Sequence, residues 1–177
     1  MDAYANSKTP EEARDKRATP GPVFDAIRQH LNLRPTLDVC AEGHTAKCAE
    51  FFTEGALERR WTVADGFSEV CWMNPPYSSP YEWCKKAADE AQRGAIVIGL
   101  LPDDRSTKWF KEQVYPQASA IYTTNRRVSF LDENGEPQAG NPKGSIIPIW
   151  TPWEVDSPAS GYIKIPRWNA KKREWLM

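Results

Sequence analysis

The sequence predicts an α/β protein built on a doubly wound, mostly parallel sheet with an antiparallel C-terminal hairpin. Three observations predict this class. Helical and strand patterns alternate along most of the 177 residues. The run AIVIGLL (95–101) is continuously apolar, as expected for a strand covered on both faces. Two apolar runs within 127–150 flank a loop rich in Gly, Asn and Pro (132–144), which predicts the hairpin.

Two helices carry clear boundary signals. The first is expected to begin with Thr19 as N-cap and Pro20 at the first helical position. The second is expected to begin with Ser79 as N-cap, to form a capping box with Glu82 and to end at Gly94. Further elements are expected as a helix over 106–115 and as strands over 35–41, 50–54, 69–73 and 119–124.

Composition indicates an ordinary globular protein, since 40% of its residues are hydrophobic and 27% are charged. A net charge of −1 argues against a protein that coats nucleic acid, but it leaves room for a local basic face. No apolar run approaches the length of a membrane span, and the polar segment 1–18 does not resemble a secretory signal. We therefore expect a cytoplasmic protein with a flexible segment 1–18, a single domain over 19–177 and a basic C-terminal tail.

The four cysteines do not have the spacing of a zinc site, because no two of them form a C-x-x-C pair. We expect them to be reduced and mostly buried, and we expect no metal. Whether the chain forms oligomers is not indicated by the sequence.

The stretch WMNPPYSSPYEWC places two consecutive prolines directly after an expected strand. Proline fixes its own φ and cannot donate to a strand ladder, so the turn at Asn74–Tyr77 has a preset backbone. The side-chain oxygen of Asn74 and the carbonyl of Pro75, held in place by Pro76, could accept both N–H bonds of an aromatic exocyclic amine. Tyr77 could stack on the ring that carries the amine. The alternative is a rigid strand-to-helix turn with no chemical role.

At this point the chain resembles a known family. The tetrad NPPY resembles the catalytic motif of amino-methyltransferases that use S-adenosylmethionine. Six segments resemble, in order, the phage-type DNA N-6-adenine methyltransferase (Dam) family: TPGPVFDAI, TLDVCAEGHTAKC, FFTE, WMNPPYSS, LLPDDRSTKWF and RVSFLDENGEPQAGNPKGSIIPIW. The resemblance covers residues 19–150, and the ordered set is more specific than the tetrad alone.

The resemblance implies a Rossmann-like methyltransferase sheet, S-adenosylmethionine as cofactor and double-stranded DNA as partner. It implies methyl transfer to the N-6 amine of an adenine flipped out of the duplex, in a bacterial or phage-infected cytoplasm. The alternatives are another acceptor (cytosine N-4, RNA adenine or a glutamine amide) or a catalytically silent DNA-binding domain. The family name suggests a GATC target, which this sequence does not show.

The resemblance also implies residues for the methionine end of the cofactor. Asp38 would hold the ammonium, and a carboxylate at a strand end is a good acceptor for it. The alternative for Asp38 is a helix cap. Thr19 and Pro20 would begin a helix that closes over the same end, and Cys40 and Ala41 would allow close backbone approach.

Two further acidic residues are candidates for the other end of the cofactor. Glu54 is a candidate for the ribose hydroxyls, with a solvated surface carboxylate as the alternative. Asp65 is a candidate for the adenine amine of the cofactor, with a turn residue as the alternative. A Gly-x-Gly loop, common in larger methyltransferases, is absent here, and only Gly43 follows the first expected strand.

Contacts with DNA phosphates are expected from Lys and Arg side chains. The candidates near the expected crevice are Arg105, Lys108, Arg126, Arg127 and Lys143. A basic tail interleaved with Trp168 adds Lys164, Arg167, Lys171, Lys172 and Arg173. For each of them the alternative is an ordinary solvated surface charge.

Overall fold

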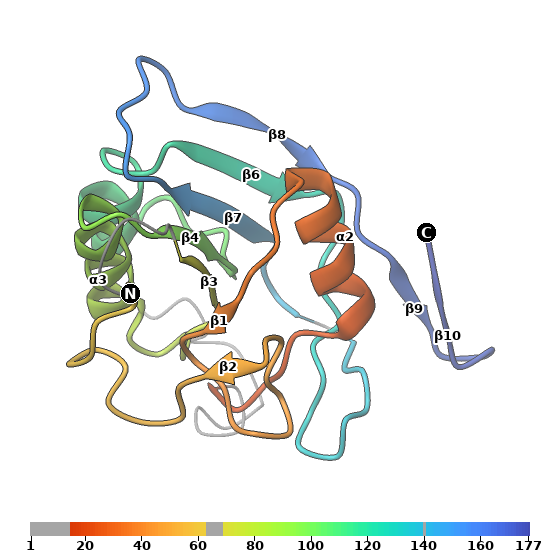
Figure 1. Cartoon of the computed structure of the whole chain (residues 1–177). Coiled ribbons are helices and arrows are strands. Elements are labelled where there is room, and N and C mark those ends of the chain that lie inside the picture. The colour runs from red at the N-terminus through yellow and green to blue at the C-terminus, as the bar shows by residue number, and fades with distance from the viewer. Residues whose placement is uncertain (1–14, 63–68, 140) are drawn as a thin grey trace.

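The computed structural model describes residues 15–62, 69–139 and 141–177, and within these ranges eight strands form one sheet (Figure 1). The order across the sheet is β2 (Glu50–Phe51), β1 (Leu37–Asp38), β3 (Val70–Met73), β4 (Ile96–Gly99), β7 (Ser145–Trp150), β6 (Ala120–Thr124) and β8 (Ala159–Ile163), while β5 (Leu101–Pro102) pairs with β7. Strand β7 runs antiparallel to β4, β5 and β6, and the other pairs are parallel. The predicted mostly parallel, Rossmann-like methyltransferase sheet is confirmed.

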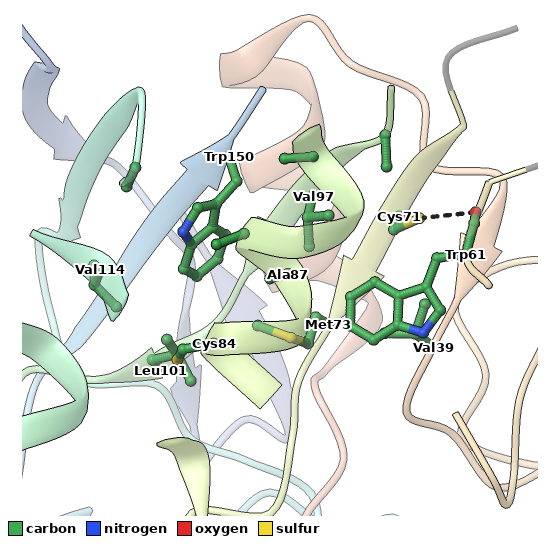
Figure 2. Close-up of a cluster of buried hydrophobic side chains, with 14 of the residues drawn as sticks. Val39, Trp61, Cys71, Met73, Cys84, Ala87, Val97, Leu101, Val114 and Trp150 are labelled. Atoms are coloured by element: carbon green, nitrogen blue, oxygen red, sulfur yellow. Dashed lines mark hydrogen bonds between the residues drawn. The ribbon is translucent and has the colours of Figure 1, made fainter. Parts of the chain in front are cut away.

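Helices cover both faces of the sheet, and the side-chain alternation of the strands explains why. Helix α2 (Gly21–Leu31) packs on one face, against a cluster that includes Trp72, Ile98 and Ile149. Helices α3 (Pro80–Gln92) and η1 (Phe110–Val114) pack on the other face, against the neighbouring positions Cys71, Val97 and Trp150 (Figure 2). Register agrees with this division, because Cys71 lies opposite Val97 and Trp72 lies opposite Ile98.

The helix boundaries differ in detail from the sequence prediction. The N-cap of α2 is Pro20 rather than Thr19, so the helix begins one residue later than expected. Ser79 is the N-cap of α3 as predicted, but the capping box with Glu82 is wrong because no side chain caps this helix. Ser79 is exposed, so solvent can satisfy the first N–H groups. Gly94 ends α3 as predicted, with a φ of +113° that favours glycine.

The run 95–101 forms two strands instead of the single one expected. The ladder between β4 and β7 stops after Ile98, which lies opposite Ile149. The next residue on β7 is Pro148, which has no N–H to donate. Pairing resumes where Leu101 of β5 lies opposite Ile146. Gly99 also has little room for a side chain, since an added Cβ would lie 3.2 Å from Trp150.

The hairpin predicted within 127–150 is also wrong, although β7 itself is a strand. Both edges of β7 are already paired, by β4 and β5 on one side and by β6 on the other, so the segment before the loop has no edge to join. Leu131 instead makes isolated bridges with Ala18 and Pro137. The C-terminal antiparallel hairpin lies farther along the chain, between β9 (Arg167–Asn169) and β10 (Glu174–Leu176).

The cysteines are free thiols, as predicted, but only two of the four are buried. Cys71 and Cys84 are buried, whereas Cys40 and Cys48 are half-buried. Burial is the main cause that raises the pKa of each thiol, to about 12 for Cys48. No helix in the described part of the chain is long and apolar enough to cross a membrane.

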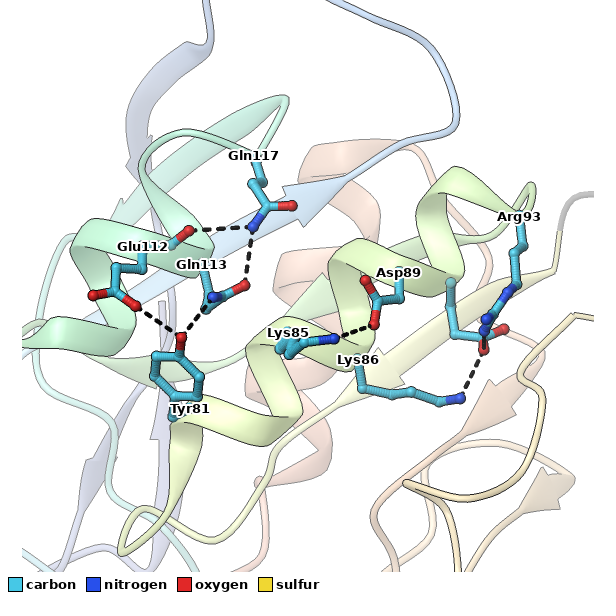
Figure 3. Close-up of polar contacts among 9 residues, drawn as sticks. Tyr81, Lys85, Lys86, Asp89, Arg93, Glu112, Gln113 and Gln117 are labelled. Carbon is cyan, nitrogen blue, oxygen red and sulfur yellow. Dashed lines mark hydrogen bonds and ion pairs between the residues drawn. The ribbon is translucent and has the colours of Figure 1, made fainter.

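Helix α3 carries a buried carboxylate that binds three hydrogen-bond donors. Glu90 is fully buried, and its oxygens accept hydrogen bonds from the side chains of Lys86 (2.8 Å) and Arg93 (2.6 Å), which Figure 3 shows. The backbone N–H of Trp61 donates a third hydrogen bond at 3.0 Å. Burial alone would raise the pKa of Glu90, but these donors outweigh it and hold that pKa below its ordinary value. Nearby, Tyr81 of α3 donates to Glu112 of η1 at 2.7 Å and joins the two helices.

We predict that Glu90→Gln lowers the free energy of unfolding at pH 7 by about 1.5–3 kcal/mol, because hydrogen bonds to a charged group are lost. A carboxylate with a lowered pKa stabilises the fold at neutral pH, and this contribution disappears as the pH falls through the folded-state pKa. The difference in stability between the wild type and the variant should therefore shrink as the pH falls below the ordinary pKa of a glutamate. The measurement is urea unfolding between pH 3 and 7.

The matched control is Asp89→Asn on the same helix, whose partner Lys85 is 51% exposed. An exposed pair of this kind contributes little to stability. A Glu90→Gln effect as small as that of the control would contradict the assignment.

Candidate functional site

All strands of the sheet except β7 run toward the same edge. Because β6 and β4 are both antiparallel to β7, β6 and β8 run in the same direction as β1, β3 and β4. Asp38 therefore lies at this edge at the end of β1, and Asn74 follows β3 there. Parallel α/β sheets bind ligands beyond this edge. Two hollows are found here, and Asn74 lines both of them.

The larger hollow is a cavity of about 180 Å³. It brings together four of the residues expected to bind a cofactor: Thr19, Asp38, Cys40 and Ala41. Its wall also includes residues that the sequence analysis did not select: Asp15, Lys16, Arg17, Ala18, Glu42, Thr45, Lys47, Thr53, Trp72 and Trp83. Trp72 and Trp83 supply an aromatic part of this wall.

Asp38 is held in place by the loop that follows it. Its carboxylate is 2% exposed and accepts backbone N–H groups from Cys40 (3.2 Å) and Lys47 (2.9 Å). The helix cap considered as the alternative is wrong, because the residues that follow Asp38 form bends and turns rather than a helix. Burial raises the pKa of Asp38, and the two N–H groups lower it only in part. A bound cation at this carboxylate would relieve that desolvation penalty.

The buried hydroxyl of Thr19 is a second feature that indicates a ligand in this cavity. Its side chain is 1% exposed and lines the larger cavity, yet its Oγ1 has no hydrogen-bond partner among the described residues. An unsatisfied buried hydroxyl costs free energy. The pair of a buried carboxylate and an orphaned hydroxyl fits a ligand that has a cationic amine and polar neighbours.

The smaller hollow is lined by Asn74, Pro75 and Tyr77 on one side and by Phe130 and Asn141 on the other, with Asp15 and Arg17 beside them. Its volume is about 10 Å³, the space of roughly one water molecule. Phe130 and Asn141 were not selected from the sequence. A signal was present for Asn141, since Asn141–Pro142 repeats the dipeptide Asn74–Pro75.

Tyr77 is anchored at both ends of its side chain. Its hydroxyl donates to the carbonyl of Leu100 at 3.2 Å, beyond the end of β4. Its ring lies edge-on to Phe130, with centroids 5.8 Å apart and an interplanar angle of 90°. The ring orientation is therefore fixed by contacts with two other parts of the chain.

Residues 15–18, at the end of the segment that we expected to be flexible, lie across the turn 74–78. The carboxylate of Asp15 accepts hydrogen bonds from the backbone and the side chain of Ser78. The Nδ2 group of Asn74 donates to the carbonyl of Arg17 at 3.3 Å. Ala18 forms a two-way backbone bridge with Leu131. These contacts place the segment over both hollows.

Two of the expected cofactor residues that lie in the described part of the chain do not line the larger cavity. Pro20 caps α2 directly after Thr19, and Glu54 is exposed outside the wall, where Thr53 takes part instead. Asp65 lies outside the described residues. Among the described residues, no group of three or more His, Cys, Asp and Glu side chains could hold a metal ion.

The cations expected to bind DNA lie around this edge, and several of them already contact carboxylates of the protein. Lys143 forms an ion pair with Asp104 and is 28% exposed, so a phosphate would compete with that carboxylate. Arg105 donates to Asp103 and Thr123, both at 3.0 Å, and Lys108 lies 4.0 Å from Glu112. Arg126 and Arg127 follow the end of β6.

The basic tail forms the hairpin β9–β10, which extends from the end of β8 away from the body of the protein (Figure 1). Trp168 and Trp175 contact each other across the hairpin, with centroids 5.5 Å apart. Arg173 binds both oxygens of Glu136, at 3.0 and 3.2 Å. This contact joins the hairpin to the loop that continues to Asn141.

Comparison with known proteins agrees with this geometry. The family model described as DNA N-6-adenine-methyltransferase (Dam) matches residues 6–172. A DNA N-6-adenine-methyltransferase of Haemophilus phage HP1 is 35% identical over 148 residues, 82% of this chain and 84% of that protein. A protein of the same name from Escherichia phage T1 is 30% identical over 161 residues, 81% of this chain and 66% of that protein. No solved structure matches the chain.

We predict that Asp38→Ala accelerates hydrogen exchange at the backbone amides of Cys40 and Lys47. A hydrogen bond to a carboxylate contributes about 1.5–3 kcal/mol, so exchange should rise roughly 10- to 100-fold. Asp38→Asn keeps one acceptor oxygen and should fall between the variant and the wild type. The measurement is amide exchange by NMR, with the exposed Asp25→Ala as control. Unchanged exchange in Asp38→Ala would mean that other contacts hold this loop.

Proposed function

Because the chain belongs to the DNA N-6-adenine-methyltransferase (Dam) family, we propose that it transfers a methyl group from S-adenosylmethionine to the N-6 amine of an adenine in double-stranded DNA. The adenine must first leave the base stack, since its amine cannot otherwise reach a pocket inside a protein. One observation carries the proposal: Asn74 lines both hollows at the edge of the sheet, so a donor in one and an acceptor in the other would meet there.

The larger cavity is the proposed site of the cofactor. Asp38 would accept a charge-assisted hydrogen bond from the methionine ammonium, and Thr19 would use its unsatisfied hydroxyl on the same end. The backbone of Cys40 and Ala41 would allow close approach, and Trp83 would contact the apolar surface of the ligand. When bound there, S-adenosylmethionine supplies an electrophilic methyl group on a positively charged sulfur.

The turn after β3 is the proposed site of the target amine. The two N–H bonds of the amine would be accepted by Oδ1 of Asn74 and the carbonyl of Pro75. This arrangement turns the nitrogen lone pair out of the ring plane. The donation from Nδ2 of Asn74 to the carbonyl of Arg17 fixes which end of the amide is available as acceptor. Positioning of this kind is a large part of catalysis.

No general base is needed before the new bond forms. The amine attacks as a neutral group, the N–C bond forms as the bond to sulfur breaks, and the nitrogen then carries an extra proton. That proton is acidic at this stage and passes to solvent. The contribution of the protein is therefore the placement of the amine by Asn74 and Pro75.

The smaller pocket must open before a base can enter, since its present volume holds roughly one water. Asp15 and Arg17 line the pocket from the segment 15–18, which belongs neither to the sheet nor to the loops that connect its strands. We propose that DNA binding displaces the side chains of Asp15 and Arg17 from the pocket, while the carbonyl of Arg17 keeps its hydrogen bond with Asn74. Tyr77 would then stack on the base, and its edge-on contact with Phe130 would hold the ring in place.

Phosphate contacts would come from cations near the same edge. Arg126 and Arg127 follow β6, and the exposed side chains of Lys171 and Lys172 lie on the hairpin β9–β10, which begins near the end of β8. A protein with a net charge of −1 depends on such a local basic surface to bind DNA.

The direct test of the function is mass spectrometry of nucleosides from DNA of cells that express the protein. The proposal expects 6-methyladenine, which is absent from cells with an empty vector in a methylase-free host. N-4-methylcytosine instead of 6-methyladenine would assign a different acceptor to the same site.

Asn74→Ala should lower the rate of methyl transfer by on the order of 10²–10³, as expected for loss of one preorganised polar contact. Affinity for S-adenosylmethionine should change little, because Asp38 and Thr19 remain. Calorimetry with the cofactor and single-turnover methylation measure the two effects separately. Asn134→Ala, an exposed position in the loop 132–144, is the control. Turnover near the wild-type level in Asn74→Ala would remove Asn74 from the mechanism.

Tyr77→Phe should keep most of the activity, because the ring remains and only the hydrogen bond to Leu100 is lost. Its cost in stability should be about 0.5–1.5 kcal/mol. Tyr77→Ala should weaken base binding by about 1–3 kcal/mol, and less when the target adenine lies opposite a mismatch. Methylation of paired and mispaired oligonucleotides measures this difference. Equal damage from Phe and Ala would show that the hydroxyl, rather than the ring, is the important group.

A further inference from the structure

Asn141 is a buried polar residue to which the mechanism above gives no role. Its side chain lines the smaller pocket together with Asn74, Tyr77 and Phe130, and the residue is only 5% exposed. Within the described residues, no side-chain hydrogen bond is made by its amide, whereas Asn74 donates to Arg17. An amide that lines a pocket and makes no such hydrogen bond has both its donor and its acceptor available to a ligand that enters the pocket.

The position of Asn141 is fixed by its neighbours rather than by contacts of its own side chain. Pro142 restricts its backbone to extended conformations. Two residues later, Lys143 forms an ion pair with Asp104, and the carbonyl of Gly144 accepts the backbone N–H of Asp103 at 2.9 Å. Ser145 then begins β7. The amide is therefore presented to the pocket from an anchored stretch of chain.

We propose that Asn141 recognises the ring of the target adenine, with its Nδ2 group donating to one ring nitrogen. This inference rests on the proposed function, because it requires an adenine in the smaller pocket. Both hydrogens of the exocyclic amine are taken by Asn74 and Pro75 in that function. The polar groups that remain on the adenine base are N1, N3 and N7, and all three are acceptors. A second amide in the pocket can meet them only as a donor.

This contact would contribute to the specificity of the enzyme for adenine over the other bases. Guanine carries an N–H at N1 and an oxygen at C6, and cytosine has no five-membered ring, so neither presents the adenine set of acceptors. A buried polar group left unpaired by the wrong base discriminates more strongly than an apolar wall does. Asn141 is thus proposed as a specificity-determining residue.

The test uses duplex oligonucleotides in which the target adenine is replaced by 1-deaza-, 3-deaza- or 7-deazaadenine. Each analogue exchanges one ring nitrogen for C–H and keeps the amine. Transfer of a labelled methyl group gives kcat/KM for the wild type and for Asn141→Ala. We expect one analogue to lower kcat/KM of the wild type roughly 10- to 100-fold, the equivalent of one lost hydrogen bond to a buried group. The same analogue should have little further effect on Asn141→Ala.

The comparison across the two proteins removes effects of the analogue on the amine itself, because these act equally on both. Asn134→Ala, an exposed residue of the same loop, should keep the full penalty of the wild type. A penalty of equal size in the wild type and in Asn141→Ala would overturn the proposal. So would equal rates of the wild type on all three analogues, a result that needs no variant and therefore holds even if Asn141→Ala does not fold.

Failure of the proposed function is distinguishable from failure of this inference. If the wild type does not methylate the natural adenine, both are overturned. If it methylates adenine with no dependence on any ring nitrogen, the function stands and the role of Asn141 falls.

Discussion

The site depends on the rigid turn that two consecutive prolines impose at the end of β3. Residues on either side of these prolines bind two other parts of the chain: Asn74 and Ser78 bond to Arg17 and Asp15 of the segment 15–18, and the hydroxyl of Tyr77 donates to the carbonyl of Leu100. Because the φ angles of Pro75 and Pro76 are fixed, the residues that make these contacts are held at set positions relative to one another. The two hollows at the edge of the sheet share a wall for the same reason.

Several polar groups at this edge lower the stability of the folded protein when no ligand is bound. The carboxylate of Asp38 is buried with a raised pKa, and Thr19 leaves its hydroxyl unsatisfied. Asn141 adds a buried amide in the smaller pocket. By contrast, the buried carboxylate of Glu90, remote from the two hollows, has three donors and a lowered pKa. The raised pKa of Asp38, the unsatisfied hydroxyl of Thr19 and the amide of Asn141 in the pocket lining together indicate a surface prepared for ligands.

The sequence predicted the sheet, its two covering helices and the edge that holds Asp38 and Asn74, because these follow from periodicity and proline placement. It did not predict the break at Gly99, which depends on Pro148 lying opposite in space. It also placed a hairpin at 127–150, because local pattern does not tell that both edges of β7 are already paired. Phe130 and Asn141 were missed for a related reason: a loop distant in sequence brings them beside Tyr77.

The central claim is that the methyl donor and the target adenine occupy the two hollows that meet at Asn74. A crystal structure with S-adenosylhomocysteine and a duplex oligonucleotide measures this most directly. The account predicts the homocysteine ammonium within hydrogen-bond distance of Asp38, and the adenine N-6 atom within hydrogen-bond distance of Oδ1 of Asn74. An adenine held elsewhere, such as the groove between Ser78 and Trp109, or a cofactor distant from Asp38, would contradict it.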